Sequence, residues 1–109
     1  MEEDDLQLKP AAAKEPDQID VVWDKDKRSY NETEHEISFQ EAATVFSDAL
    51  ATVIDDPDHS VDEQRLLILG ESKSGHLIVV SYTERRGKIR IISARKPTPR
   101  ERKDYEEGR

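Results

Sequence analysis

The chain has 109 residues, of which 34% are hydrophobic and 39% are charged, and its net charge is −8 at neutral pH. This length suits one small domain, and the absence of cysteine excludes disulfides and thiolate metal sites. No apolar run approaches the roughly 20 residues that a membrane helix needs, and the acidic start MEEDDLQLKP does not have the pattern of a secretory signal. We therefore expect a cytoplasmic protein without a membrane partner.

The charge is unevenly distributed along the chain. Residues 1–20 hold seven acidic and two basic side chains, whereas residues 83–109 hold ten basic and five acidic ones. Contacts with phosphate depend on where Lys and Arg lie and not on the summed charge. The acidic total therefore does not exclude a nucleic acid as a partner of the C-terminal quarter.

The N-terminal part of the chain changes character near residue 19. Residues 1–18 are polar, contain two prolines and show no sustained periodicity, so we expect a disordered acidic tail followed by one domain over residues 19–109. The branched and aromatic run IDVVW (residues 19–23) predicts a short strand. Asp24 can then cap a helix that extends to about His35, in which Tyr30 is the only large apolar side chain.

The next segment, SFQEAATVFSDAL (residues 38–50), predicts a stronger helix. Ser38 and Glu41 have the spacing of a capping box, in which each side chain bonds the other residue's backbone N–H. Apolar residues recur at helical spacing and predict one buried stripe: Phe39, Ala42, Ala43, Phe46 and Leu50.

Four strands and a helix follow. ATVID, RLLILGES, HLIVVSYTE and KIRIISAR read as strands, and the short turns KSG and RRG favour an antiparallel meander. TPRERKDYEE begins a helix with Thr98 as its cap, Pro99 at its first position and Glu101 completing a capping box. The order β-α-α-β-β-β-β-α predicts an α+β domain, with two N-terminal helices and one C-terminal helix on a mostly antiparallel sheet.

Several kinds of site are not supported by the sequence. The segment DDPDHSVDE has oxygen ligands that suit Mg²⁺ or Ca²⁺, but its spacing does not match a calcium loop and Asp-Asp-Pro-Asp is ordinary turn chemistry. There is no GxSxG, no phosphate-binding loop and no GxGxxG fingerprint. We expect no metal and no cofactor.

Polar residues on the predicted strands suggest another chemistry. Arg65 opens one strand, Tyr82 and Thr83 close the next, and Arg90 and Arg95 lie in the last. Arginine offers a rigid fork for phosphate, and RNA cleavage without a metal needs only charge stabilisation and proton transfer at the reacting phosphate. Alternatively, the arginines pair with carboxylates and merely orient the last helix.

Strand geometry restricts the arginine site. Arg90 and Arg95 are five residues apart, so in a regular strand they face opposite sides. They can serve one site only if a bulge intervenes or if Arg95 lies beyond the strand end. His35 closes the first helix, where a histidine either caps or packs, or else acts at a functional site.

Four segments of the chain together resemble a known family. They read WDKDKRSYNETEHEISFQEAATVF, DDPDHS, RLLILGES and VVSYTERRGKIRIISARKPTPRERKDY, and they cover about residues 20–107. The chain resembles the BrnT family of type II toxins. This resemblance implies a compact RelE-like fold and a ribonuclease that blocks translation. It also implies a BrnA-like ribbon-helix-helix antitoxin, through which alone the pair contacts operator DNA.

The resemblance also implies roles for individual residues. The polar positions of the family fall on Lys27, His35, Arg65, Tyr82, Thr83, Glu84, Arg90, Ser93 and Arg95. We assign catalysis to Arg65, Tyr82, Arg90 and Arg95. We assign RNA binding to Lys27, His35, Thr83 and Ser93.

Two positions depart from the family pattern. Glu34 and Glu36 stand where the family usually has a lysine and a glycine. A glutamate repels phosphate. Glycine adopts a positive φ without strain, whereas glutamate adopts it only at an energetic cost. The sequence therefore leaves three hypotheses: an active endoribonuclease, a weak or inactive homologue that binds the antitoxin and helps to regulate transcription, or an orphan domain that binds neither RNA nor an antitoxin.

Overall fold

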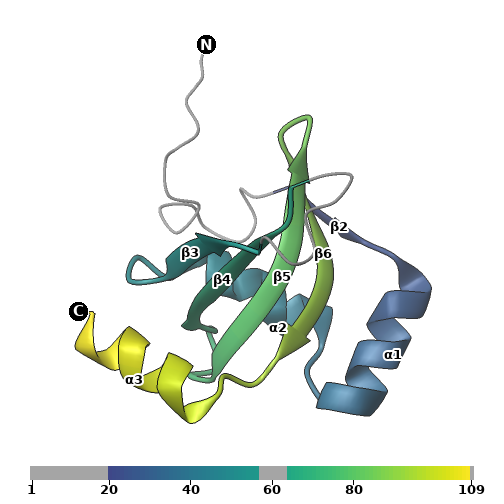
Figure 1. The fold of residues 1–109 in the computed structure, drawn as a ribbon. Coiled ribbons are helices and arrows are strands. Elements are labelled where there is room, and N and C mark those ends of the chain that lie inside the picture. Colours follow the sequence, from purple (N-terminus) through teal and green to yellow (C-terminus); the bar gives the residue numbers. More distant parts are fainter. Residues whose placement is uncertain (1–19, 57–63, 109) are drawn as a thin grey trace.

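The computed structural model of the protein describes residues 20–56 and 64–108. The predicted acidic tail (residues 1–18) and most of the predicted turn DDPDHSVDE lie outside the described residues. Figure 1 shows the elements in this order: β2 (Val21–Trp23), α1 (Lys25–His35), α2 (Phe39–Thr44), the 3₁₀ turn η3 (Val45–Ser47), β3 (Thr52–Asp55), β4 (Leu66–Glu71), β5 (Leu77–Arg85), β6 (Lys88–Arg95) and α3 (Pro99–Glu107).

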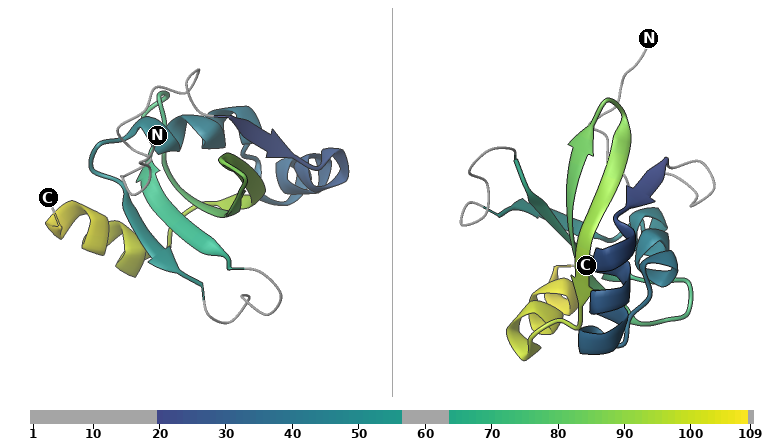
Figure 2. Two further views of the ribbon diagram at one scale, coloured as in Figure 1. Left: turned by 90° about the horizontal axis from the view of Figure 1, so that it is seen from above. Right: turned by 90° about the vertical axis from the view of Figure 1, so that its right-hand side faces the viewer.

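All five strands form one sheet, in the order β2-β6-β5-β4-β3. β2 pairs with β6 in parallel, and the other three pairs are antiparallel. α2 and α3 lie on opposite faces of the sheet, and α1 lies beside β6 (Figure 1 and Figure 2). The predicted α+β class, with two N-terminal helices and one C-terminal helix, is confirmed. Among the described residues, no helix is long and apolar enough to cross a membrane.

The hydrophobic core lies between α2 and one face of the sheet. Phe39, Ala42 and Phe46 are fully buried there. On β5, Val80 and Tyr82 point into the same core, because alternate residues of a strand face the same side. The Phe46 ring meets the Tyr82 ring edge to face, with centroids 4.9 Å apart. Burying side chains of this size stabilises the fold by about 1.5–3 kcal/mol each.

The helix predicted over residues 38–50 is shorter than expected. α2 ends at Thr44, η3 follows, and Leu50 is 48% exposed instead of joining the buried stripe. The reason is Asp48, whose backbone is extended at φ −78° and ψ 114°. Its carboxylate accepts from the N–H of Leu50 at 2.9 Å, the N–H of Glu71 at 2.8 Å and the hydroxyl of Tyr105 at 2.6 Å. A short acidic side chain that bonds backbone groups in this way competes with helix formation.

The predicted local signals for the other elements are present. Asp24 caps α1 through its side chain, and Arg86 (φ 54°) with Gly87 (φ 80°) forms the two-residue turn between β5 and β6. α3 has its complete capping box: the Thr98 hydroxyl accepts from the Glu101 N–H, and the Glu101 carboxylate accepts from the Thr98 N–H. These short-range features fix where α1 and α3 begin.

Candidate functional site

Most of the predicted site residues that lie on strands are on the face of the sheet that points away from α2 and the core. Across β5 and β6, Thr83 pairs with Arg90 and Ser81 pairs with Ser93, whereas the intervening pair of Tyr82 and Ile91 faces the core. Same-face neighbours along a strand are roughly 7 Å apart. Arg90 and Ser93 therefore lie side by side on one surface, which we call the outer face.

A bulge in β6 decides which later residues reach the outer face. Ser81 pairs with Ser93 while Tyr82 pairs with Ile91, so Ile92 is the extra residue. Because of this insertion, Arg95 shares the outer face with Arg90 instead of pointing to the core. A bulge is one of the two conditions under which strand alternation allows the two arginines to share a face, and the structure contains it.

Arg90 and Thr83 form the least satisfied polar pair on the outer face. The Arg90 side chain is exposed, and it makes no hydrogen bond or ion pair in the described structure. Thr83, its partner across the strands, is only 2% exposed, and its hydroxyl oxygen lacks a hydrogen-bond partner among the described residues. A buried hydroxyl without a partner is uncommon in proteins. Within the described residues, the pair thus combines an exposed cation without a partner and, on the neighbouring strand, a buried hydroxyl without one.

Arg65 lies at the same end of the outer face. It precedes β4, and its carbonyl accepts from the Asp56 N–H at 2.9 Å. The next residue, Leu66, packs on the core and pairs with Tyr82. Alternation therefore places Arg65 on the outer side, at the Thr83 end of β5. Arg65 is half-buried and is not without interactions in the structure.

Arg95 is held by the last helix. Its guanidinium donates to both carboxylate oxygens of Glu101, at 2.8 and 3.0 Å, and to the carbonyl of Lys96 at 3.2 Å. The hydrogen bond from Arg95 is the main cause that lowers the pKa of Glu101 to about 2. A bidentate pair of this kind fixes orientation as well as contributing energy. This geometry matches the alternative reading of Arg95, in which it orients α3.

Tyr82 does not lie with the other predicted catalytic residues. Its side chain is 2% exposed and packs on Phe46 in the core, and burial raises the pKa of its hydroxyl. Successive side chains of a strand point to opposite faces, so Thr83 points to the outer face while Tyr82 points to the core. The prediction of proton transfer by Tyr82 at the arginine site is therefore corrected: consecutive residues of a strand cannot serve the same face.

The remaining predicted residues line a hollow between α1 and β6. Lys27 and His35 of α1 contribute to it together with Ser93 of β6. The other residues of its lining are Asp26, Tyr30, Asn31 and Ile92. A second hollow on the other side of His35 is lined by Glu34, Glu36, Arg95, Lys96 and Thr98. The structure thus brings Lys27, His35 and Ser93 together, and Ser93 links them to Arg90.

Asn31 was not among the predicted site residues, yet it positions this hollow. It is 2% exposed, its side-chain oxygen accepts from the Ala94 N–H at 2.9 Å, and its side-chain nitrogen donates to the Ile37 carbonyl at 3.0 Å. Both ends of the amide are engaged, so Asn31 fastens α1 to β6. The sequence contains only a weak signal for this role: α1 has one large apolar side chain, Tyr30, so a polar residue is left to attach the helix.

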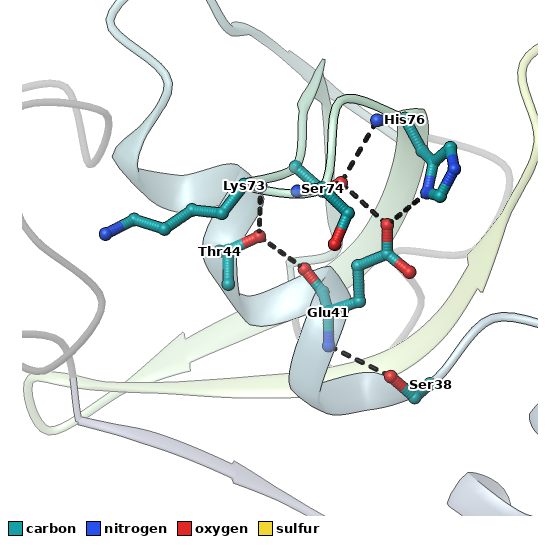
Figure 3. A network of polar contacts seen from close by, with 7 residues as sticks. Ser38, Glu41, Thr44, Lys73, Ser74 and His76 are labelled. Carbon is teal, nitrogen blue, oxygen red and sulfur yellow. Dashed lines mark hydrogen bonds and ion pairs between the residues drawn. The ribbon is translucent and has the colours of Figure 1, made fainter.

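A second polar cluster lies at the turn between β4 and β5 (Figure 3). Glu41 Oε2 accepts from the Ser72 hydroxyl and from His76 Nδ1, each at 2.6 Å, and these bonds lower the pKa of Glu41, with the Ser72 bond as the largest cause. The Lys73 N–H also donates to the Thr44 hydroxyl at 2.9 Å. A nucleophilic triad needs the serine bonded to the histidine. Here both bond the carboxylate, so the cluster ties this turn to α2.

Metal ligands are not grouped in the part of the chain that the structure describes. Within residues 20–56 and 64–108, no group of three or more His, Asp or Glu side chains could hold a metal ion. The acidic segment at residues 55–63 falls mostly outside the described residues.

One family model and one solved structure are similar to this chain. The family described as "Ribonuclease toxin, BrnT, of type II toxin-antitoxin system" matches residues 23–101. The crystal structure of the Brucella abortus ribonuclease toxin, BrnT, superposes with a TM-score of 0.56 at 23% sequence identity, over 73% of this chain and 97% of that one. At this identity, the likeness of the two structures concerns the fold. A comparison with curated proteins gives no significant match.

Proposed function

The chain belongs to the BrnT family of type II toxin–antitoxin ribonuclease toxins, and from this premise we propose that it is an endoribonuclease whose site is the outer face around Arg90. The single observation that carries the proposal is the pair of Arg90 and Thr83. Arg90 has an exposed guanidinium without a partner in the described structure, and the residue paired with it across the strands has a buried hydroxyl that also lacks one. An exposed guanidinium without a partner suits a phosphodiester, whose oxygens accept from its N–H groups.

The reaction proposed for this site requires no metal. The ribose 2′-oxygen attacks the adjacent phosphorus and loses its proton to a base, while the bond from phosphorus to the 5′-oxygen breaks and that oxygen gains a proton. The negative charge that develops on the phosphate is stabilised by Arg90, with Arg65 at the same end of the face. Donors that are already oriented toward developing charge are commonly the largest single contribution to catalysis.

His35 is our candidate for proton transfer. Histidine is the most frequent general acid or base in proteins. His35 shares its hollow with Ser93, which lies next to Arg90 on the outer face. Lys27 lines the same hollow and supplies a cation for a second phosphate of the RNA. In this arrangement Arg95 positions α3 and Tyr82 packs the core, so we propose no chemical step for either residue.

The family also suggests the biological setting. A type II toxin has a protein antitoxin as its partner. We propose that the antitoxin is a BrnA-like ribbon-helix-helix protein, that operator DNA is contacted only through it, and that cleavage of cytoplasmic RNA inhibits translation. Co-expression with the neighbouring open reading frame should then restore the growth of cells that the toxin arrests.

The test of the proposal is cleavage of RNA by the purified chain. The wild-type protein should cleave single-stranded RNA in the presence of EDTA, and Arg90→Ala should lower the rate by about 100-fold or more, as when one charge-stabilising donor is removed. Arg100→Ala, a change of an exposed arginine in α3, is the matched control and should retain the wild-type rate. Cleavage that needs a divalent ion, or an unchanged rate for Arg90→Ala, contradicts the proposal.

A second candidate function is favoured by Glu34 and Glu36. Both line the hollow that also holds His35 and Arg95, and both place negative charge where RNA would pass. Under this alternative the chain binds its antitoxin and represses transcription but cleaves RNA poorly. Glu34→Lys should then raise the cleavage rate and the affinity for RNA by about 5-fold or more, because each added phosphate contact strengthens binding. Equal rates for the two proteins, with antitoxin binding intact, contradict this explanation.

A further inference from the structure

α1 presents an aromatic ring to solvent beside the proposed site. Tyr30 is 67% exposed, more than the other exposed large hydrophobic residues of the described chain, which are Val22, Leu50, Val53 and Ile54. It lines the hollow between α1 and β6 together with Lys27, one helical turn earlier, and Ser93 of β6. The ring therefore lies next to a cation and a hydroxyl.

The backbone around this ring is fixed in place. Asn31, the residue after Tyr30, is buried and joins α1 to the Ala94 N–H of β6 and to the Ile37 carbonyl. Asn31 lines the hollow but is almost fully buried, and one bond at each end of its amide fixes its orientation. The exposed ring is thus carried by a rigid element, which lowers the entropy lost when a ligand binds.

The chemistry of the hollow fits a nucleotide of single-stranded RNA. Unpaired bases stack on exposed aromatic rings, and lysine binds the adjacent phosphate. Asp26, on the same lining, repels phosphate but can accept from a base N–H or from a ribose 2′-hydroxyl. The phosphate is therefore directed to the side of Lys27 and Ser93, and the base to the ring.

We propose that Tyr30 is a stacking platform for an unpaired base of the RNA substrate, with Lys27 on the adjacent phosphate. The inference rests on the RNA-binding part of the proposed function. It adds a contact with the flat face of a base, whereas Arg90 is proposed to contact only the phosphate backbone of the RNA. Stacking accepts every base, so it adds affinity and fixes the strand in its path without selecting a sequence.

The experiment uses two fluorescent oligonucleotides of equal length and charge, and fluorescence anisotropy as the readout. One is a single-stranded RNA with 2′-fluoro sugars, which cannot be cleaved by 2′-oxygen attack, and the other has the same backbone without bases. Tyr30→Ala should weaken binding of the first by about 5- to 100-fold and leave binding of the second within about twofold. Tyr30→Phe, which keeps the ring, and Ile54→Ala, which changes an exposed residue of the opposite edge strand β3, should match the wild type on both.

Four results would overturn the inference. They are wild-type affinity of Tyr30→Ala for the base-bearing strand, an equal loss on both strands, a loss in Tyr30→Phe as large as in Tyr30→Ala, and failure of the wild type to bind either strand. If Tyr30→Ala keeps wild-type affinity for the base-bearing strand but binds the antitoxin more weakly, the inference is also overturned, and Tyr30 is a contact for the antitoxin. If Tyr30 is needed for binding the base-bearing strand but ordinary RNA stays intact, the nuclease proposal fails and the stacking inference stands.

Discussion

Replacing Glu36 with glycine should stabilise the domain. Glu36 ends α1 in the left-handed region, at φ 61° and ψ 28°, with its N–H bonded to the Glu32 carbonyl at 3.1 Å. A residue with a Cβ pays roughly 1–2 kcal/mol for this conformation, and glycine gives part of that back through its more flexible unfolded state. We expect a net gain of about 0.5–1 kcal/mol for Glu36→Gly, or about 2–6 °C in Tm for a domain of this size, measured by thermal and urea unfolding.

Two control variants separate the backbone effect from the charge. Glu36→Gln removes the negative charge at the end of the helix but keeps the strained φ, so it should gain only a few tenths of a kcal/mol. Glu34→Gly places the glycine two residues earlier, inside the last turn of α1, and should lose about 1 kcal/mol. A gain in Glu36→Gly no larger than that in Glu36→Gln would refute the strain argument and leave the charge as the cause.

Two further predictions concern stability. Because Arg95 holds the pKa of Glu101 near 2, below the ordinary 4.5, this carboxylate contributes stability above pH about 4.5 that is lost as the pH falls toward 2. Glu101→Gln should cost about 1–2 kcal/mol at pH 7 after allowance for solvent screening, less at pH 3, and Glu106→Gln on the same helix should cost nothing measurable; equal losses at the two pH values would contradict the ion pair. Gly70→Ala should cost about 1–3 kcal/mol in urea unfolding, because its Cβ would lie 2.9 Å from Val45 Cγ1, and an unchanged midpoint would show that β4 shifts freely.

Features set by neighbouring residues could be predicted from the sequence. Asp24, Thr98 with Glu101, and the turn at Arg86 and Gly87 behave as their local chemistry predicts. Caps and tight turns depend on groups within about four residues, so the sequence alone contains the cause. The antiparallel order of β4, β5 and β6 follows from the short turns between them, whereas the parallel pairing of β2 with β6 does not.

Features set by distant residues could not be predicted in this way. α2 ends early because Asp48 bonds Glu71 and Tyr105, which are 23 and 57 residues away. The capping box expected of Ser38 and Glu41 is half-formed, since the Ser38 hydroxyl accepts from the Glu41 N–H while the Glu41 carboxylate turns to Ser72, 31 residues away. Helical spacing extends through residue 50, but tertiary contacts override it.

The residues of the candidate site also differ in whether their positions depend on neighbouring or on distant residues. Alternation alone separates Tyr82 from Thr83, so the sequence itself contains the cause of the opposite orientations of these two side chains. For Arg95 the sequence left open a phosphate contact or a carboxylate pair that orients α3. It did not identify Glu101 as the partner, because the cap of α3 already explains that residue. In the structure Glu101 does both: Oε1 accepts from the Thr98 N–H and from Arg95. One carboxylate thus joins the start of a helix to a strand.

The bulge at Ile92 connects these observations. The two residues that fasten the helices on either side of the outer face follow it: Ala94, whose N–H is bound by Asn31 of α1, and Arg95, which is bound by Glu101 of α3. Without the extra residue, the side chain of Arg95 would point to the core and could not reach α3. The separation of α1 from α3 across the outer face is therefore set by β6 beyond Ile92. Arg90, which lies before the bulge, keeps the regular register with Thr83 and is left without either helix as a partner.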